Sequence, residues 1–196
     1  GSHTVVELLN DNYEVVVVDN LSNSSLKVLD GIREITNKSV DFLDYDIRDY
    51  SKLEGIIGYY QQSIAGVIHF AACKSVGESM LNASKYYDNN VTGTNNLLRA
   101  MKRYKAKNLV FSSSCTVYGQ ADQLPITEHA PIKKAKSPYG NTKQIGEDIL
   151  YDNTRSNALL KVISLRYFNP IGGHSSIEIG ELPKGKPQNL VPFITQ

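Results

Sequence analysis

Short apolar runs alternate along the chain with longer stretches of helical periodicity. Five runs are apolar nearly throughout and end in turn-forming residues, which predicts buried strands at Glu14–Asp19, Val40–Asp46, Gly66–Ala72, Asn108–Ser114 and Leu160–Phe168. The stretches between them predict helices at Ser25–Thr36, Asp49–Gln62, Ser84–Tyr104 and Ser137–Asn153. This alternation predicts an α/β fold: a doubly wound parallel sheet with right-handed crossovers and helices on both faces.

The first nine residues predict a helix with no strand before it. Apolar residues at positions 5, 6, 8 and 9 predict a helix over Thr4–Leu9, and Val15–Asp19 then predicts a fully buried strand. A helix that leads into a buried parallel strand should follow another strand, so we expect the chain to begin inside a βαβ unit. In dinucleotide-binding units a glycine opens the first helix, because a side chain there would push helix and strand apart, and an acid about 20 residues later binds the ribose. Gly1 and Asp19 fit these two positions.

Polar or small residues stand at the carboxyl end of every predicted strand. Ligands of doubly wound sheets bind at these ends, although the turns that follow strands also favour Asp, Asn and Ser. The five ends are Asp19-Asn20, Asp46-Ile47, Phe70-Ala71-Ala72, Ser112-Ser113-Ser114 and Phe168-Asn169. Because all five carry such residues, the sequence predicts a ligand site along this edge.

The segment Ser137–Lys143 carries the sharpest chemical motif. Ser137 before Pro138 predicts a helix start with Ser137 as its N-cap. Tyr139 then lies in the first turn, and Lys143, four residues later, lies on the same face. An ammonium and a helix N-terminus both favour the phenolate form and are expected to lower the tyrosine pKa, ordinarily about 10. Tyr139 is thus a candidate base and Ser114 a candidate donor to a substrate hydroxyl; a surface Tyr–Lys pair is the alternative.

Composition narrows the classes of partner. The 196 residues are 41% hydrophobic, enough for a sizeable core, and 21 basic against 20 acidic residues give a net charge of +1. This balance gives no electrostatic reason to expect nucleic acid or an anionic membrane as partner. We also expect no signal peptide and no bilayer-spanning segment. The four histidines and two cysteines lack metal-ligand spacing, so no metal site is expected.

Two stretches fall outside the predicted elements. The first, Gly119–Lys136, is a long polar loop, and loops of this length in compact domains are usually functional. From Asn169 onward, Gly and Pro recur and predict irregular chain.

Motifs over essentially the whole chain resemble the extended short-chain dehydrogenase/reductase superfamily, and within it the nucleotide-sugar 4-epimerases. The similar segments include GSHTVVELL, VVVVDNLSNSS, YDIRD, VIHFAACKSVGES, YYDNNVTGT, FSSSCTVYG, SPYGNTK, LRYFNPIGGH and PQNLVPF. The resemblance implies that Gly1 is the last glycine of the cofactor fingerprint and not part of a tag. It implies a Rossmann-like, NAD-binding domain over residues 1–168, without its first strand, and the start of a substrate-binding region over residues 169–196.

Site residues carry over from this resemblance where the letters match. The implied catalytic set is Ser114, Tyr139 and Lys143. The implied cofactor contacts are Gly1, Asp19, Asn20, Leu21, Ser22, Asn23, Ser24, Asp46, Ile47, Phe70, Ala71, Ala72, Lys74, Asn89, Ser114, Tyr139, Lys143 and Phe168. The implied substrate contacts are Ser114, Tyr139, Asn169, Asn189 and Leu190. No arginine follows Asp19 to accept a 2′-phosphate, which favours NAD over NADP.

The implied activity is NAD-dependent 4-epimerisation of a UDP-hexose through a 4-keto intermediate. The resemblance also implies a cytoplasmic homodimer joined by the helices at 84–104 and 137–153. One alternative is another nucleotide-sugar epimerase of the same superfamily, or a nucleotide-sugar 4,6-dehydratase. Dehydratases of this kind resemble one another in an Asp-Glu pair where this chain has Cys115-Thr116, which counts against elimination. The other alternative is a non-catalytic cofactor-sensing or interaction protein. The presence of all three residues of the implied catalytic set, Ser114, Tyr139 and Lys143, argues against it.

Overall fold

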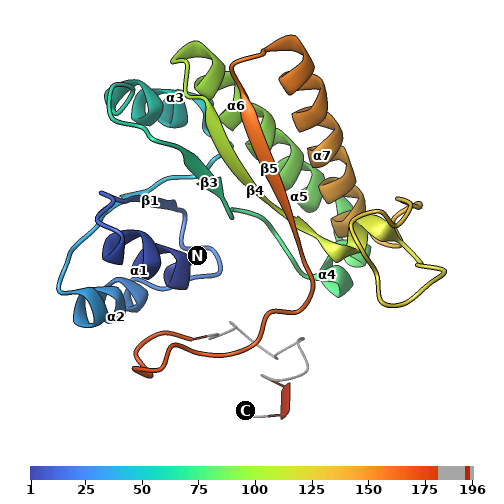
Figure 1. The fold of residues 1–196 in the computed structure, drawn as a ribbon, viewed down its shortest axis with the longest axis horizontal. Coiled ribbons are helices and arrows are strands. Elements are labelled where there is room, and N and C mark those ends of the chain that lie inside the picture. Colours follow the sequence, from blue (N-terminus) through green and yellow to red (C-terminus); the bar gives the residue numbers. More distant parts are fainter. Residues whose placement is uncertain (181–192, 195–196) are drawn as a thin grey trace. The chain divides into compact units, whose positions relative to one another are not determined.

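The computed structural model describes residues 1–180 and 193–194, and Figure 1 shows the course of the chain. The chain divides into two compact units. One comprises Gly1–Asp46 and the described residues from Asn169 onward, and the other comprises Ile47–Phe168. Each unit contains parallel strands and α-helices, and all strand pairs among the described residues are parallel. The predicted α/β class is therefore confirmed.

The first unit is a strand pair with two helices. Helix α1 spans Ser2–Asn10, strand β1 Val16–Asp19, helix α2 Lys27–Thr36 and strand β2 Asp41–Asp44. The predicted first helix is confirmed. Strand β1 is half-buried along its length, where the sequence predicted full burial, because it has a hydrogen-bonded neighbour strand on one side only. The core of this unit consists of Val6, Leu9, Ile32 and Ile179.

The second unit is built on a three-stranded sheet in the order β3-β4-β5. Strand β3 spans Val67–His69, β4 Asn108–Ser114 and β5 Lys161–Tyr167, each within a run predicted to be a strand. The central strand, β4, begins and ends at the predicted residues. Its register places Ser113 opposite Arg166 on β5.

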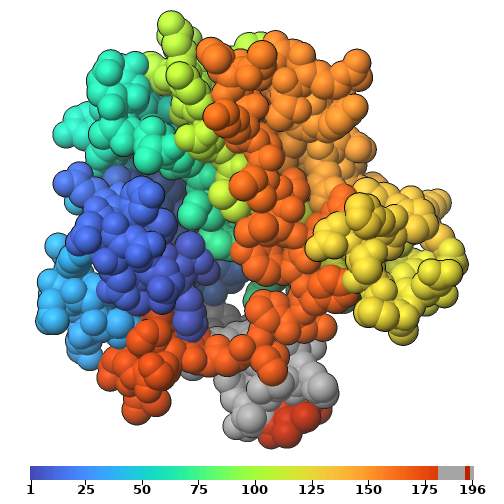
Figure 2. Space-filling view, viewed as in Figure 1, coloured from blue at the N-terminus to red at the C-terminus, as the bar shows by residue number. Residues whose placement is uncertain are grey.

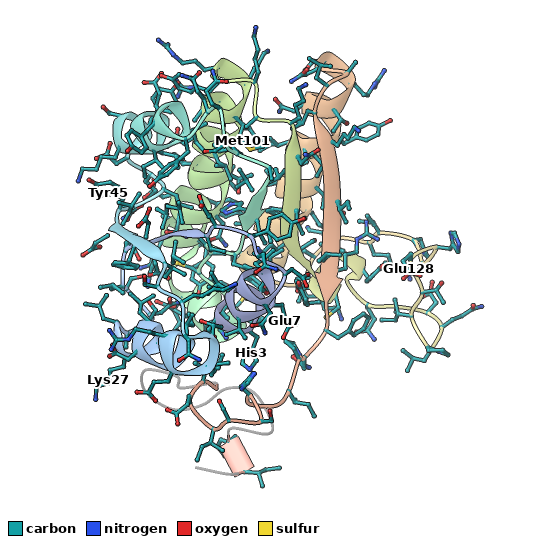
Figure 3. All side chains as sticks on the ribbon, turned by 60° about the vertical axis from the view of Figure 1, so that its left-hand side comes forward. His3, Glu7, Lys27, Tyr45, Met101 and Glu128 are labelled. Carbon is teal, nitrogen blue, oxygen red and sulfur yellow. The ribbon has the colours of Figure 1, made fainter. Side chains whose placement is uncertain are left out.

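Three helices cover one face of this sheet (Figure 1). They are α3, Tyr50–Tyr59, α6, Gly93–Arg103, and α7, Pro138–Ser156. Their apolar side chains meet those of β4 in one cluster, which includes Leu53, Leu97, Met101 (labelled in Figure 3), Phe111 and Leu150. This packing fixes α7 against β4.

The stretch predicted as one helix over Ser84–Tyr104 contains an irregular turn. Helix α5, Ala83–Tyr86, passes into a π-helical turn, η1, over Tyr87–Thr92, and α6 follows. The π-helical hydrogen bonds of η1 accommodate an extra residue in the helical path. Periodicity alone does not reveal such a turn.

Two short helical elements were not predicted. Helix α4 spans Val76–Leu81, and a 3₁₀ turn, η2, spans Cys115–Tyr118. The side chain of Ser75 caps α4 by accepting a hydrogen bond from the backbone N–H of Glu78 at 3.2 Å. A Ser-x-x-Glu sequence is a known helix-start signal, so the start of α4 could have been predicted from Ser75 and Glu78.

Strand β5 departs from the predicted buried strand. Three alternate side chains, Ile163, Leu165 and Tyr167, are 60%, 40% and 37% exposed, whereas Val162 packs against the core. The exposed residues share the sheet face opposite the helices, because side chains alternate along a strand. Figure 2 shows this strand uncovered on the face in view. Its continuous apolar sequence therefore does not reflect burial on both faces within the described residues of this unit.

Candidate active site

Helix α7 begins as the sequence predicts. The backbone N–H of Gly140 donates to Ser137 Oγ at 3.1 Å, and Pro138 occupies the first helical turn, where its missing N–H costs no hydrogen bond. Tyr139 consequently lies in the first turn and Lys143 in the second. This cap fixes the starting point of the helix that carries both side chains.

The predicted catalytic set comes together where β4 ends and α7 begins. The Tyr139 phenol lies close enough to the Ser114 side chain for that side chain to favour the ionised phenol. The Lys143 ammonium nitrogen lies 6.0 Å from the centre of the Tyr139 ring. Both Ser114 and Lys143 are buried. Ser114 on β4 and the Tyr139–Lys143 pair on α7, about 25 residues apart in sequence, therefore form one polar cluster.

Tyr139 does not ionise as predicted. Burial raises the pKa of its phenol, and hydrogen bonding with Ser114 only partly opposes this shift. The Lys143 ammonium donates to the backbone carbonyl of Ser112 at 2.6 Å and does not bond the phenol oxygen. The prediction that the lysine and the helix N-terminus lower the Tyr139 pKa was wrong for this arrangement, because desolvation of the phenolate outweighs them.

Lys143 occupies an environment that disfavours its charge. Burial lowers the pKa of its ammonium to about 8. Its contacts are the Ser112 carbonyl and the ring of Phe111, whose centre lies 4.9 Å from the nitrogen. A lysine with a pKa of about 8 exchanges its proton under mildly alkaline conditions.

The π-helical turn contributes an asparagine that joins two segments of the site. Asn90 Nδ2 donates to the Cys73 carbonyl at 2.9 Å and to Thr142 Oγ1 at 3.0 Å, and Asn90 Oδ1 accepts from the Cys73 N–H at 2.8 Å. Thr142 Oγ1 in turn donates to the Tyr139 carbonyl at 2.7 Å. The Tyr86 ring packs edge-on against Tyr139, with 6.5 Å between ring centres. The loop after β3 is thus tied to the first turns of α7.

In the first unit, Asp19 organises the loop that follows β1. Its Oδ1 accepts from the Leu21 N–H and from Ser24 Oγ, both at 2.7 Å. Leu21 adopts the left-handed conformation with φ 55°, which turns the chain sharply at this point. Asn20 Nδ2 donates to Asp46 Oδ2 at 2.9 Å. Asn20 Oδ1 also accepts from the N–H of the exposed Ser22 at 3.1 Å. Most of the cofactor residues predicted in this unit therefore form two neighbouring hydrogen-bonded groups, around Asp19 and around Asn20, and Asn23 lies exposed on the same loop.

The predicted cofactor residues of the second unit follow β3 and β5 and flank η1. Asn89 Nδ2 donates to Asn90 Oδ1 at 3.0 Å. The Ile47 carbonyl accepts from Asn96 Nδ2 at 3.3 Å. A Cβ at Gly93 would lie 2.3 Å from Ile47 Cδ1, so position 93 on α6 admits no larger residue without a shift of the Ile47 side chain. The other members are Phe70, whose ring lies 6.4 Å from that of Tyr167, Ala71, Ala72, Lys74 and the exposed Phe168.

The predicted residues near the two ends of the chain are less constrained. Gly1 precedes α1, and its carbonyl accepts from the Val5 N–H at 3.0 Å. A Cβ at Gly1 would meet no described atom within 4 Å, so the packing reason predicted for this glycine is not present. Asn169 is exposed. Asn189 and Leu190 lie outside the described residues.

Sequence reasoning missed a partly buried ion pair beneath α7. Glu147 and Arg166 are joined by a contact of 2.7 Å, between side chains that are 13% and 23% exposed. One signal was available, because Glu147 repeats the four-residue spacing of Tyr139 and Lys143 and so falls on their face of the helix. Nothing in the sequence indicated that Arg166 is its partner.

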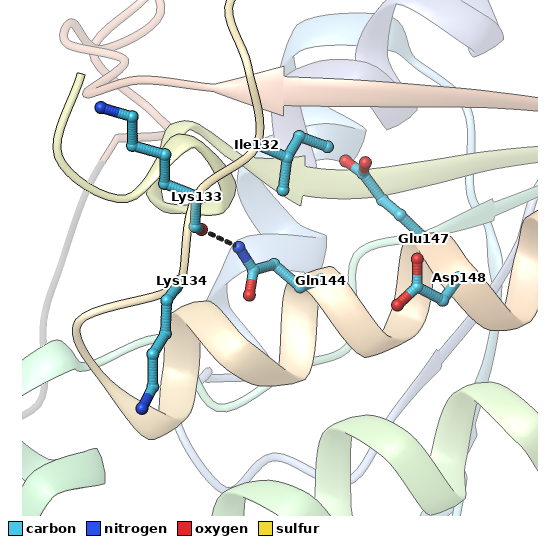
Figure 4. Close-up of a pocket in the computed structure, with 6 residues that line it drawn as sticks. All are labelled: Ile132, Lys133, Lys134, Gln144, Glu147 and Asp148. Carbon is cyan, nitrogen blue, oxygen red and sulfur yellow. Dashed lines mark hydrogen bonds between the residues drawn. The ribbon is translucent and has the colours of Figure 1, made fainter. Parts of the chain in front are cut away.

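The long loop over residues 119–136 is anchored to α7 by Gln144. Gln144 Nε2 donates to the Val117 carbonyl at 2.8 Å. It also donates to the Lys133 carbonyl at 2.5 Å, and Figure 4 draws this second bond. A hollow of about 250 Å³ lies between loop and helix, lined by Ile132, Lys133, Lys134, Gln144, Glu147 and Asp148. The predicted site residues do not line it, so this hollow is separate from the candidate active site.

Among the described residues, no group of three or more His, Cys, Asp or Glu side chains is placed to hold a metal ion. In the same part of the chain, the helices are all too short or too polar to cross a bilayer.

Comparison with known proteins gives consistent matches. The model of the NAD dependent epimerase/dehydratase family matches residues 1–192. The chain is 49% identical over 196 residues to UDP-glucose 4-epimerase of Bacillus subtilis (strain 168) and 48% identical to that of Pasteurella multocida (strain Pm70), covering 100% of this chain and 57% of each relative. The chain thus spans a little over half the length of these curated relatives.

Solved structures agree with the sequence matches. A UDP-glucose 4-epimerase from Bifidobacterium longum in complex with NAD⁺ and UDP is 44% identical, with a TM-score of 0.93 over 98% of this chain and 57% of that one. One from Stenotrophomonas maltophila with bound NAD and formylated UDP-arabinopyranose is 44% identical, with a TM-score of 0.95 over 100% of this chain and 57% of that one. Both support the Rossmann-like α/β fold.

Proposed function

Because the chain belongs to the NAD dependent epimerase/dehydratase family, we propose that the protein carrying it interconverts UDP-glucose and UDP-galactose by NAD-dependent epimerisation at C4. The observation that carries the proposal is the convergence of Ser114, Tyr139 and Lys143 at the end of β4. A hydroxyl donor, a phenol and a lysine in one buried cluster can remove a proton from a sugar hydroxyl and return it.

The described residues fit NAD as the cofactor. Asp19 ends β1 with its carboxylate held in place by the Leu21 N–H and Ser24 Oγ, as binding of a ribose requires. The loop that follows supplies no arginine for a 2′-phosphate. When bound, NAD would supply the hydride acceptor and donor. On the second unit, Phe70, Lys74 and Asn89 are the proposed contacts on the nicotinamide side.

Proton transfer is the part of the reaction that this chain's own residues perform. We assign the 4-hydroxyl proton of the sugar to the Tyr139 oxygen, with Ser114 as hydrogen-bond donor to the same hydroxyl. Burial holds the Tyr139 pKa up and the Lys143 pKa down. Two groups whose pKa values are nearly equal in water are thereby separated, so near neutral pH the Lys143 ammonium is the readier proton donor and the Tyr139 phenolate the stronger base.

The segment after Ser114 favours epimerisation over dehydration. A 4,6-dehydratase needs an extra acid and base for elimination, and the Asp-Glu pair expected just after this strand is absent from η2, which reads Cys115-Thr116-Val117-Tyr118. The product decides between the two reactions. A 4-keto-6-deoxy sugar found by mass spectrometry would replace the epimerase proposal with the dehydratase.

Tyr139→Phe tests the mechanism in the complete protein. The substitution deletes one oxygen and keeps the ring, so the helix start should survive while turnover of UDP-galactose falls about 10²–10⁴-fold. Lys143→Ala should cause a comparable loss that is partly recovered at high pH, because the phenol can then ionise unaided. Tyr139→Phe has no group left to ionise and should not recover. If Tyr139→Phe, folded and loaded with NAD, turned over within a few-fold of the parent, the assignment would be wrong.

The proposed assembly is a homodimer in the cytoplasm that pairs α7 and the helical stretch over residues 83–103 with their copies. Tyr151, which is exposed on α7, supports a contact at this surface. Sedimentation of the complete protein as a monomer at micromolar concentration would contradict this proposal.

A further inference from the structure

A partly buried network of charged and hydroxyl groups brackets Ser114 on both sides. Glu147 Oε2 accepts from Arg166 Nη2 at 2.7 Å and Glu147 Oε1 from Arg166 Nε at 3.0 Å, so the ion pair is bidentate. Ser113 Oγ donates to Glu147 Oε1, and Arg166 Nη1 donates to the Tyr118 hydroxyl at 3.0 Å. Ser113 directly precedes Ser114, and Tyr118 ends the 3₁₀ turn that follows it.

The same network fixes the helix that carries the other two site residues. Glu147 lies one helical turn beyond Lys143 and two beyond Tyr139, on the face of α7 that packs against β4. Gly146 brings this face close to the strand, because a Cβ there would lie 2.8 Å from the Phe111 ring. At that separation the Lys143 ammonium reaches a carbonyl of β4.

The four partners come from four different elements. Glu147 belongs to α7, Ser113 to β4, Arg166 to β5 and Tyr118 to η2. Arg166 reaches Glu147 because the strand register places it opposite Ser113, on the same face of the sheet. The hydrogen bonds that Arg166 donates to Glu147 also keep the Arg166 pKa above its ordinary value, so Arg166 stays charged.

We propose that Glu147 and Arg166 are positioning residues of the active site. Their ion pair sets the distance from Tyr139 and Lys143 on α7 to Ser114 on β4. They act through Ser113, Tyr118 and the two backbones, without touching the reacting atoms. The inference rests on the proposed function, since it assigns a role in that reaction.

The first test compares two Glu→Gln substitutions in the complete protein. Glu147→Gln keeps the shape of the side chain and removes its charge; Glu54→Gln makes the same change in the ion pair with Arg103, 2.8 Å long, between α3 and α6. Glu147→Gln should lower kcat about 10- to 100-fold, because a misplacement of about 1 Å costs that much. KM and bound NAD should stay within about twofold of the parent, since the residue contacts neither. The loss should shrink as pH rises, because Tyr139 then depends less on the charge of Lys143. Glu54→Gln should change none of these values.

A paired apolar substitution separates positioning from plain stability. Glu147→Leu with Arg166→Met removes both charges at similar volume, a replacement that usually preserves the stability of a buried pair. We expect the melting temperature of the parent and the low kcat of Glu147→Gln. Recovery of kcat together with the melting temperature would overturn the proposal, and so would an unchanged kcat and pH profile in Glu147→Gln. If Glu147→Gln fails to fold, the paired variant decides alone.

A parent protein that does not turn over UDP-galactose would contradict the proposed function, and the positioning role would then need a test that does not depend on turnover. In that case, ultraviolet difference titration against Tyr139→Phe reports the pH at which Tyr139 ionises. Glu147→Gln should raise that pH by moving Lys143 away from the phenol. An unchanged titration would overturn the positioning role.

Discussion

His69 offers a direct test of how burial controls ionisation in this fold. The side chain is buried on β3, and its Nε2 lies 3.0 Å from Thr94 Oγ1. The Thr94 hydroxyl donates to the Asn90 carbonyl at 2.6 Å, so its hydrogen is engaged and it accepts from His69. His69 is therefore the neutral Nε2–H tautomer. Burial, and to a lesser extent the charge of Lys143, lowers the pKa of His69 from 6.5 to about 3.

The sign of the effect follows from this depressed pKa. Below pH 6.5 His69 binds a proton in the unfolded chain but not in the folded protein. The contribution of neutral His69 to the free energy of unfolding is therefore complete above pH 6.5 and is lost as pH falls toward 3. Each pH unit in this window costs about 1.4 kcal/mol. At pH 4.5 the loss from His69 is about 3 kcal/mol, and it approaches about 5 kcal/mol at pH 3.

His69→Gln removes the titrating group and keeps an amide that can donate to Thr94. At pH 7.5 the variant should be about 1 kcal/mol less stable, for the lost contact with the Phe111 ring, whose centre is 5.8 Å away. At pH 4.5 it should be more stable than the parent by about 2 kcal/mol, because the parent alone has lost the His69 contribution. Urea unfolding followed by circular dichroism at both pH values measures the difference. His129→Gln, at an exposed position, is the control. Parallel losses of stability in parent and variant between pH 7.5 and 4.5 would refute the reasoning.

Two further predictions concern α7. Gly146→Ala should destabilise the protein by about 1–3 kcal/mol in urea unfolding, because the new Cβ would overlap the Phe111 ring. The control is Gly55→Ala on α3, whose Cβ would meet no atom within 4 Å and which should stabilise the protein by about 0.5–1 kcal/mol. Equal effects of the two substitutions would contradict the packing argument. Lys143→Met should abolish a gain in stability of about 3 kcal/mol between pH 8 and 10.5, since in that window the unfolded chain holds a proton that the folded lysine, with its pKa of about 8, has released. A parent whose stability is flat over this range would disprove the low lysine pKa.

The parts of the site that the sequence predicted depend on local chemistry. Ser137 and Pro138 specify the start of α7 through hydrogen bonds and backbone angles within one turn, so the placement of Tyr139 and Lys143 on one face followed. The end of β4 at Ser114 was likewise predictable from a run of apolar residues that gives way to serines.

The parts that escaped prediction depend on contacts between distant segments. The sign of the Tyr139 pKa shift was wrong, because it is set by the depth of burial, which spacing along a helix does not report. The pairing of Glu147 with Arg166 needs the register of β4 and β5 together with the close approach of α7. The exposure of Ile163 on β5 follows from its place on the sheet face opposite the helices of this unit, which an apolar sequence does not indicate.

The π-helical turn over Tyr87–Thr92 bears on how this chain tolerates deletions. Removing one residue there would allow a regular α-helix and would change the direction in which the side chains of the turn point, because the π-helical turn holds one residue more than an α-helical path. The local helix would gain regularity, yet the Asn90 amide would turn away from Cys73 and Thr142 and release the loop after β3 from α7. A deletion designed to make this helix regular and more heat-resistant would therefore remove the contact between the loop after β3 and α7. In a scan of single-residue deletions, the least regular turn of the helix should be the one where length matters most.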